Sequence, residues 1–287
     1  MRSTIGVHHL KPLIGVQISA LDVTCTLDKA ATRDIVHLLN TRGLVVIRDQ
    51  QLTPEQLVTF SRSLGELNEH PLEKFAARGF PALMIHSNII DNGEPLGLAE
   101  TGQRWRIDGA HLKTPYRASL RYAVEIPAQD GVALGDTWFA STAAAYDALE
   151  PALRQQLQGM HAIHMHGAGR KKRSTPYFPD SALTQGFRRG VEHPVVRTHP
   201  HNRRKCLYVN PLTTSHIRGM NEQDSSALLD QLYEHMARPE FAYRHQWQVG
   251  DLVMWDNCMT QYRTANDYEL PLRRMLYCAQ IKGALAV

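Results

Sequence analysis

Trp255-Asp256-Asn257-Cys258-Met259-Thr260-Gln261-Tyr262 is the stretch that decides the fold of this chain. It closes a short apolar run and precedes a basic segment that carries Arg273 and Arg274. An earlier stretch, Trp105-Arg106-Ile107-Asp108-Gly109, follows polar, glycine-containing sequence. The interpretation of the site depends on Arg106 and Tyr262, one in each stretch.

Short strands dominate the rest of the chain. Runs bounded by turn residues predict strands at 43–48, 82–86, 119–125, 161–166, 195–198, 205–209, 241–247, 252–255 and 273–281. Gly250-Asp251 separates two of these runs in the manner of a hairpin. Many short strands with a few peripheral helices favour a sandwich or jelly roll. Without an internal repeat or a clear linker, the pattern predicts a single domain over residues 1–287.

Helices are indicated by their caps. Asp28 can begin a helix that Gly43 ends. Thr53-Pro54-Glu55-Gln56 combines a cap, a proline at the first helical position and a capping-box glutamine. Two more helical regions are predicted at 142–159, with a restart at Pro151, and at 222–237.

The bulk composition excludes several classes of protein. The chain has 287 residues, 43% of them hydrophobic, and a net charge of +4, which suits a globular protein with a sizeable core. The basic run 170–173 is interpreted as a solvated loop, because nucleic-acid binding needs a broader basic face. No apolar stretch approaches the roughly 20 residues that cross a membrane, and the N-terminus lacks a signal pattern. Four scattered cysteines, without a C-x-x-C pair, predict reduced thiols in a cytoplasmic protein.

In their order, the two opening stretches resemble the taurine/2,4-D dioxygenase family of Fe(II)- and 2-oxoglutarate-dependent oxygenases. That family reads W-H-x-D-G at the first stretch and W-D-N-R-x-x-x-H at the second. The resemblance extends from Ile14–Ser19 to Gly283 and includes Thr198-His199-Pro200 and Tyr208-Val209-Asn210, which we interpret as scaffold. It implies a mainly β double-stranded β-helix with peripheral helices and a site at the mouth of the barrel. Because such proteins are commonly dimers or larger, it also implies a homo-oligomer.

Both family histidines that bind iron are replaced, by Arg106 and Tyr262, and only Asp108 of the three usual ligands is retained. A guanidinium has no lone pair to give, and a phenolate favours ferric over ferrous iron. Unit charges about 4 Å apart interact by about 4 kcal/mol at an effective dielectric of 20, so a fixed cation opposes a divalent ion strongly. We therefore expect no iron and no other metal at this site.

Arg106 has two interpretations. Arginine forms two parallel hydrogen bonds with a carboxylate, so Arg106 can pair with Asp108. Such a pair either plugs a dead site or holds a substrate carboxylate where iron would have been.

The cosubstrate residues of the family are better preserved. The resemblance implies that Thr137, in Gly135-Asp136-Thr137, and Arg274 bind 2-oxoglutarate or another small carboxylate. Arginine suits bidentate carboxylate binding, although Arg274 could also be a surface arginine. Two further family arginines are replaced by Cys258 and Cys278, which we interpret as buried packing residues.

The histidines give weaker predictions. His70 resembles a family histidine that touches the substrate, so it is a substrate-binding candidate. His111, three residues after Asp108, is a candidate displaced ligand or general acid/base, and His86 is a weaker candidate. His164 and His166 share one strand face, and such a pair is more often structural than metallic.

Three functions follow from this pattern. The favoured one is an enzyme that uses metal-free chemistry on a small carboxylate. Its catalytic set is Arg106, Asp108, His111 and Tyr262, in which the phenolate of Tyr262 is stabilised by the nearby guanidinium. The second is a non-catalytic metabolite-binding or regulatory protein, and the third is a working dioxygenase with a rearranged iron site. No nucleic-acid or membrane partner is expected.

Overall fold

The computed structural model describes residues 5–69, 73–99, 102–166, 168 and 190–286. Its main element is an eight-stranded sheet in which every neighbouring pair is antiparallel except β2 and β3. In spatial order its strands are β1 (Gly6–His9), β2 (Val16–Ser19), β3 (Leu44–Ile47), β18 (Leu252–Asp256), β8 (Ala118–Glu125), β20 (Met275–Ile281), β5 (Phe80–Ser87) and β4 (Ala76–Ala77). Strands from both ends of the described chain share this sheet.

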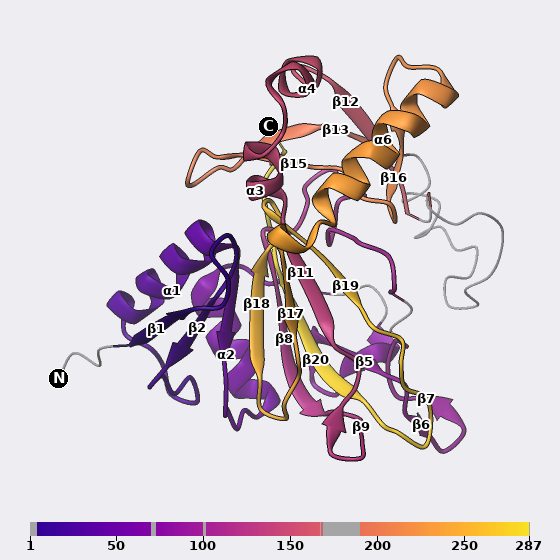
Figure 1. Ribbon diagram of the computed structural model, residues 1–287. Coiled ribbons are helices and arrows are strands. Elements are labelled where there is room, and N and C mark those ends of the chain that lie inside the picture. The colour runs from indigo at the N-terminus through magenta and orange to yellow at the C-terminus, as the bar shows by residue number, and fades with distance from the viewer. Residues whose placement is uncertain (1–4, 70–72, 100–101, 167, 169–189, 287) are drawn as a thin grey trace.

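A smaller sheet faces the large one. It contains β17 (Ala242–His245), β11 (Thr137–Ser141) and β19 (Thr260–Thr264) in that order, and Figure 1 shows these strands running beside β8, β18 and β20. Phe139 and Tyr262 from the small sheet share one buried cluster with Trp255 and Leu276 from the large sheet. Two sheets closed around a shared core form a jelly roll, which confirms the predicted fold class.

A second group of elements lies above the barrel in Figure 1. It contains β12 (His161–His164), β13 (Val191–Pro194), β14 (Val196–Thr198), β15 (Lys205–Leu207), β16 (Thr214–Ile217), α3 (Thr142–Asp147), α4 (Pro151–Gln156) and α6 (Glu222–Met236). This group has its own buried cluster, to which α6 contributes Leu228, Leu229 and Leu232. Minor elements are η1 (Glu73–Phe75), η2 (Pro239–Phe241), β6 (Ile90–Asp91), β7 (Glu94–Pro95), β9 (Ala128–Gln129) and β10 (Val132–Ala133).

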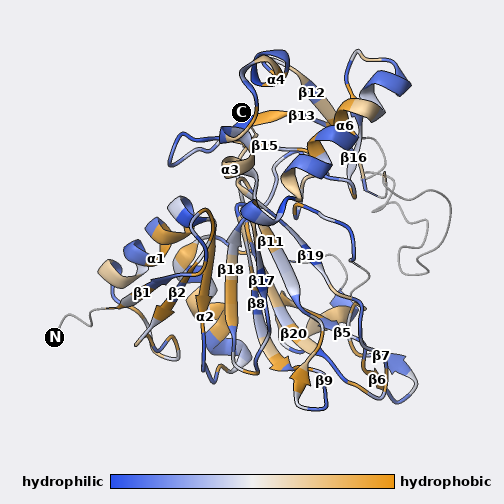
Figure 2. Ribbon diagram, in the orientation of Figure 1, coloured by the Kyte–Doolittle hydropathy of each residue, from blue (hydrophilic) through white to orange (hydrophobic). Residues whose placement is uncertain are grey.

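Two helices cover the outer face of the large sheet. The predicted caps are confirmed, because Asp28 accepts from Ala31 N at the start of α1 (Lys29–Arg42) and a capping box opens α2 (Pro54–Leu64). Apolar residues of both helices share one cluster with the strands beneath them. Figure 2 shows α1 in mixed colours, as expected of a helix with one face in water. None of the helices in the described segments is long and apolar enough to cross a membrane.

Two details differ from the sequence predictions. Gly250-Asp251 does not close a hairpin, because β17 pairs with β11 whereas β18 pairs with β3 and β8. The apolar patterns also miss β11 and β19, the strands that carry Thr137 and Tyr262. Buried residues occupy both faces of each strand, so neither strand shows the alternation of a half-buried one.

Candidate active site

Arg106 and Tyr262 lie side by side. Their backbones form an isolated antiparallel bridge, with hydrogen bonds of 2.8 Å from Arg106 N to Tyr262 O and 2.9 Å in return. The two residues are 9% and 2% exposed. The guanidinium carbon of Arg106 lies 4.2 Å from the centre of the Tyr262 ring, which is a cation–π contact.

Asp108 joins this pair through the tyrosine hydroxyl. Tyr262 donates a hydrogen bond of 2.8 Å to Oδ1 of Asp108, and Ser119 donates one of 2.7 Å to Oδ2. Asn257 in turn donates to the Ser119 hydroxyl over 3.0 Å. The predicted two-bond pair of Arg106 with Asp108 is therefore wrong within the described residues, because the carboxylate binds two hydroxyls instead.

The Arg106 guanidinium is directed elsewhere. Its Nη1 donates to the Gly102 carbonyl over 2.8 Å, and its Nη2 lies 3.5 Å from the Thr264 hydroxyl. These contacts place the charge over the ring of Tyr262 rather than against the Asp108 carboxylate.

A second guanidinium, which the sequence interpretation missed, reaches the same tyrosine. Arg121 on β8 is 2% exposed, and its Nη2 donates to the Tyr262 hydroxyl over 3.3 Å. Its guanidinium carbon lies 5.1 Å from the Tyr262 ring and 5.5 Å from the Trp255 ring. The alternation of side-chain direction along Ala118–Glu125 could have revealed this residue from the sequence, because it places Arg121 on the barrel face with Ala123.

The predicted carboxylate-binding residues lie further along the barrel interior, where Thr137 pairs with Thr264, two residues beyond Tyr262 on β19. Thr137 is fully buried, and its hydroxyl accepts a 3.0 Å hydrogen bond from Trp247 Nε1. A hydroxyl that accepts one bond can still donate its own hydrogen. Arg274 is 1% exposed, which excludes the surface alternative, and its Nη2 donates to the Gly135 carbonyl over 3.1 Å.

Gly135 is required beside Arg274. Its φ is +77°, a conformation that favours glycine. A Cβ at this position would lie 2.9 Å from Arg274 Nε and 2.9 Å from the Tyr268 ring. The main chain therefore presents its carbonyl to Arg274 only if residue 135 has no side chain.

His111 belongs to a different group of side chains. Its ring contacts the His166 ring at 5.4 Å, edge to face. Burial, and then the nearby His166, lower the pKa of His111 to about 4, so the ring is neutral near pH 7. Among the described residues, the hydrogen bonds of Asp108 go to other side chains. The catalytic role of His111 remains a prediction.

The other histidines are placed as follows. His164 is fully buried in β12, and burial, with His193 and His111 nearby, lowers its pKa to about 3. His86 is half-buried in β5. His70 lies outside the described residues, so its contact with the substrate stays a prediction.

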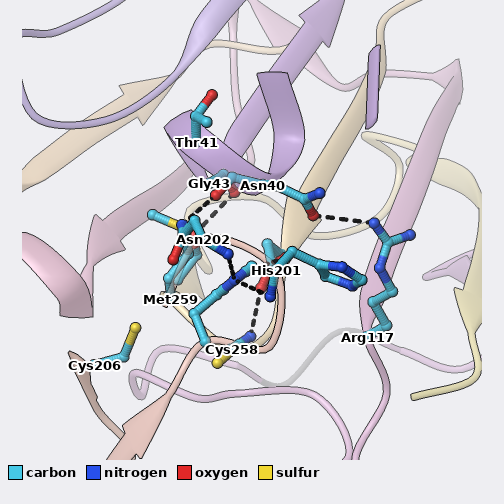
Figure 3. Close-up of polar contacts among 12 residues, drawn as sticks. Asn40, Thr41, Gly43, Arg117, His201, Asn202, Cys206, Cys258 and Met259 are labelled. Carbon is cyan, nitrogen blue, oxygen red and sulfur yellow. Dashed lines mark hydrogen bonds and ion pairs between the residues drawn. The ribbon is translucent and has the colours of Figure 1, made fainter. Parts of the chain in front are cut away.

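Cys258 lies in the turn between β18 and β19, a region that Figure 3 shows in detail. It is 4% exposed, and its backbone N–H donates to Asp256 over 2.8 Å. It packs with Cys206 in one buried cluster. The Cys258 thiol and burial raise the pKa of the Cys206 thiol well above its usual value. Its burial beside the Cys206 thiol supports the interpretation of Cys258 as a packing residue.

The same turn is fixed to the rest of the scaffold. His199 Nε2 lies 3.1 Å from Asp256 Oδ2, while its Nδ1 accepts from the backbone of His201 and Asn202. The Asn202 side chain reaches both the Asn40 carbonyl and the sulfur of Met259, as seen in Figure 3. These contacts support the scaffold role predicted for the Thr198-His199-Pro200 segment.

The donor set at Asp108 does not fit ferrous iron. Arg106 cannot ligate a metal, and the Tyr262 hydroxyl already donates its proton to Asp108. In the parts of the chain that the structure describes, no group of three or more His, Cys, Asp or Glu side chains is placed to hold a metal ion. A 2-oxoglutarate-like carboxylate fits better, because Thr137 and Arg274 both offer donors.

A surface hollow of about 560 Å³ lies away from all these residues. It is formed by the end of β2, the loop after it and the loop after β3, with Arg48 and Gln50 in its lining. Its lining includes none of the predicted site residues, and we give more weight to the convergence of buried polar side chains than to this shallow hollow.

Comparison with known proteins identifies the family of this chain. Residues 7–279 match the model of the family described as "Taurine catabolism dioxygenase TauD, TfdA family". The alpha-ketoglutarate-dependent 2,4-dichlorophenoxyacetate dioxygenase of Cupriavidus pinatubonensis is 31% identical, over 95% of this chain and 96% of that protein.

Solved structures show the same similarity. A taurine dioxygenase from Burkholderia xenovorans matches with a TM-score of 0.82 and 30% identity, over 99% of this chain and 91% of that one. AAD-2, solved in complex with Mn(II) and N-oxalylglycine, matches with a TM-score of 0.84 and 28% identity, over 99% of both chains.

Proposed function

The chain belongs to the taurine catabolism dioxygenase TauD, TfdA family, and we propose that it is a divergent member that acts on a small carboxylate without iron. One observation carries this proposal: Tyr262 donates to Asp108 and accepts from Arg121, while Arg106 lies over its ring. The relatives are dioxygenases by name, so the proposal concerns what this chain's own side chains allow.

Electrostatics supports the loss of iron. Each guanidinium about 4–5 Å from a divalent cation would oppose it by roughly 7–8 kcal/mol at an effective dielectric of 20. Arg106 and Arg121 both lie within this range of the Tyr262 ring. One carboxylate, Asp108, does not offset two such charges.

The same contacts suit Tyr262 to proton transfer. Its proton can pass to Asp108 while the Arg121 guanidinium stabilises the phenolate oxygen. The phenolate can then remove a proton from the carbon next to the substrate's carboxyl group, and the neighbouring guanidinium groups stabilise the anion that forms. General acid–base catalysis of this kind contributes about 10²- to 10⁴-fold.

Thr137 and Arg274 would hold the substrate's carboxylate. Arg274 offers a planar, permanently charged group suited to bidentate binding, and the Thr137 hydroxyl can donate. Both residues are buried at 1% or less exposure, so an anion bound there is shielded from water.

A non-catalytic metabolite-binding protein is the second candidate. The close packing of the Arg106 guanidinium on the Tyr262 ring, at 4.2 Å, favours it, because the two side chains fill each other's space. In that case the protein would bind a carboxylate saturably, form no product and be insensitive to Tyr262→Phe.

Deuterium exchange tests the proposed chemistry without knowledge of the product. The protein is incubated in D₂O and EDTA with a panel of small carboxylates, and proton NMR follows exchange at the carbon next to the carboxyl group. We expect exchange that EDTA leaves intact and that Tyr262→Phe lowers by about 10²- to 10⁴-fold. Tyr146→Phe, on α3, is the matched control and should have no effect.

Two outcomes would contradict the proposal. Exchange that persists in Tyr262→Phe would remove the tyrosine from the chemistry, and saturable binding without exchange would favour the non-catalytic candidate. Anaerobic calorimetric titration with Mn(II), with and without 2-oxoglutarate, tests the remaining possibility of a rearranged iron site. Stoichiometric micromolar binding would establish that site.

A further inference from the structure

Two arginines and two tryptophans form a continuous stack on the outer face of the small sheet. In order they are Arg244 on β17, Trp138 on β11, Arg263 on β19 and Trp105, the residue before Arg106. The strand register explains this order, because Trp138 lies opposite both Arg244 and Arg263. The guanidinium carbon of Arg263 lies 4.4 Å from the Trp138 ring and 5.5 Å from the Trp105 ring. That of Arg244 lies 5.1 Å from the Trp138 ring. We call these four residues the outer stack.

The outer stack and the site use alternate residues of the same backbone. Tyr262 packs in the buried cluster between the two sheets, whereas its neighbour Arg263 is half-buried on the other face of β19. Arg106 contacts Tyr262 on the inside, whereas Trp105 contacts Arg263 on the outside. Successive side chains of an extended chain point to opposite faces, so the contact inside the barrel has an outer contact directly behind it.

The segment that carries Arg106 into the site is attached to β19 by few backbone contacts. Residues 102–106 belong to no strand, and an isolated bridge joins them to β19. Arg106 and Tyr262 exchange two backbone hydrogen bonds of 2.8 and 2.9 Å, and Thr264 N donates to the Gly102 carbonyl over 2.9 Å. A junction of this kind opens locally more readily than a full strand. A side-chain contact on the outer face therefore adds to its stability.

Arg263 is held by its faces rather than by its hydrogen-bonding edges. In the part of the chain that the structure describes, its guanidinium has no carboxylate partner, and its Nε is buried without a hydrogen-bond partner. Burial lowers the pKa of Arg263. A planar guanidinium can stack on two rings at once, which an ammonium group cannot do. Arg263 therefore joins Trp105, beside the site, to Trp138 in the middle strand of the small sheet.

We propose that Trp105 and Arg263 are positioning residues, which hold segment 102–108 against β19 and so keep Asp108 at the Tyr262 hydroxyl. This rests on the proposed function in one respect, because that function gives the hydrogen bond from Tyr262 to Asp108 its role in proton transfer. Loss of the outer contact lets the segment move away from β19 and weakens this hydrogen bond. The pairing of β11 with β17 and β19 is unaffected.

Hydrogen–deuterium exchange of the backbone, followed by mass spectrometry, tests the attachment without a substrate. Trp105→Ala and Arg263→Ala should each raise the exchange rate of peptides covering 102–108 by about 3- to 10-fold, since each removes one partly shielded cation–π contact. Peptides from α6 should exchange at the rate of the unaltered protein. Arg263→Lys should resemble Arg263→Ala, because lysine keeps the charge but loses the stacking on both rings.

Two further variants serve as controls for this measurement. Trp105→Phe keeps an aromatic ring and should restore most of the protection that Trp105→Ala loses. Arg154→Ala removes a guanidinium that lies 5.8 Å from the Tyr146 ring, in the group of elements above the barrel. This matched loss of a cation–π contact should leave the exchange of 102–108 unchanged.

A second readout follows the site itself. Protein labelled with carbon-13 at the phenol carbon (Cζ) of tyrosine gives NMR signals that report the hydrogen bonding of each hydroxyl, and the signal missing from Tyr262→Phe belongs to Tyr262. We expect this signal to shift in Trp105→Ala and Arg263→Lys, because the Tyr262 hydroxyl loses its contact with Asp108. It should keep its position in Trp105→Phe and Arg154→Ala.

The outcomes separate this inference from the proposed function. Exchange that stays unchanged at 102–108, or that rises equally throughout the chain, overturns the inference, and so does a Tyr262 signal that does not shift. Neither measurement involves a carboxylate. If both support the attachment while the protein exchanges no protons of small carboxylates, the proposed function fails and the attachment stands.

Discussion

The two ends of the barrel interior hold guanidinium groups in different ways. At the far end, Arg274 donates to the main-chain carbonyl of Gly135, whose positive φ excludes most side chains. At the near end, Arg106 and Arg121 contact the ring and hydroxyl of Tyr262. The far end therefore relies on a backbone carbonyl beside a glycine, whereas the near end adds side-chain contacts at Tyr262 to the backbone hydrogen bond from Arg106 to Gly102.

This difference explains how one end can change its chemistry while the fold is kept. A backbone carbonyl and a required glycine leave few residue types for position 274. Side-chain contacts can be replaced as a set, because an arginine, a tyrosine and an aspartate can satisfy each other without a metal. The following experiments test whether the side chains at the near end satisfy each other without a metal.

The largest expected effect is a restored metal site. Arg106→His with Tyr262→His supplies two imidazoles beside Asp108, but the Arg121 charge remains. We expect weak Mn(II) binding by this double variant, and a micromolar Kd, worth about 8 kcal/mol, when Arg121→Leu is added. Anaerobic calorimetry measures both.

Asp108→Asn in the triple variant is the control and should abolish the added binding. Equal binding by the double and triple variants would contradict the electrostatic role given to Arg121. Absence of binding by either would place Arg106 and Tyr262 away from the ligand positions.

The second prediction concerns acid stability, and it tests whether His111 acts together with Tyr262 at the near end. Its pKa in the folded protein is about 4 against 6.5 in the unfolded chain, so the unfolded chain binds more protons as the pH falls. The contribution of His111 to the free energy of unfolding is up to about 3 kcal/mol. It is fully present above pH 6.5 and is lost as the pH falls towards 4. His111→Gln should reduce this loss, and exposed His37→Gln should not.

Urea unfolding at pH 7.5, 5.5 and 4.5 measures the change. Burial also lowers the pKa of His164 and of His193, which contribute their own pH dependence, so only the difference between variants is informative. If His111→Gln instead abolishes deuterium exchange and leaves acid stability unchanged, His111 acts in the site.

The sequence predicts the far end better than the near end, for a physical reason. Gly135, just before the strand that begins at Thr137, and Arg274, just before β20, can be recognised from short stretches of sequence. The backbone of those stretches sets the positions of these residues directly. The near end depends on which partner each polar side chain selects. Arg106 was expected on Asp108, yet the carboxylate accepts from two hydroxyls, one of which belongs to Tyr262, 154 residues away in sequence.

Arg121 shows the same limit. Its strand is recognisable, and alternation gives its face, but nothing local indicates that the face is the barrel interior. The strands β11 and β19 are missed because residues on both of their faces are buried, which removes the alternation of polar and apolar residues. Turn spacing and helix caps, by contrast, are local and predict a sandwich or a jelly roll, and the family resemblance decides between the two.

The third effect tests the backbone control of the far end. Gly135→Ala forces a Cβ to within 2.9 Å of Arg274 Nε at a φ of +77°. We expect a loss of about 1–3 kcal/mol in the free energy of unfolding and weaker carboxylate binding. Gly131→Ala, also at positive φ but with nothing within 4 Å of its Cβ, separates strain from displacement of Arg274. Carboxylate binding that both variants retain would contradict backbone control.

The smallest effect concerns one hydroxyl at the far end. Thr137→Val removes the acceptor of Trp247 Nε1 and, on our proposal, one donor to the bound carboxylate. A single hydrogen bond is worth about 0.5–1.5 kcal/mol, so calorimetry should show succinate affinity falling by about 3- to 10-fold. Thr137→Ser keeps the hydroxyl and should keep the affinity. If serine and valine bind succinate equally, the hydroxyl serves only Trp247, and carboxylate recognition at this end rests on Arg274 alone.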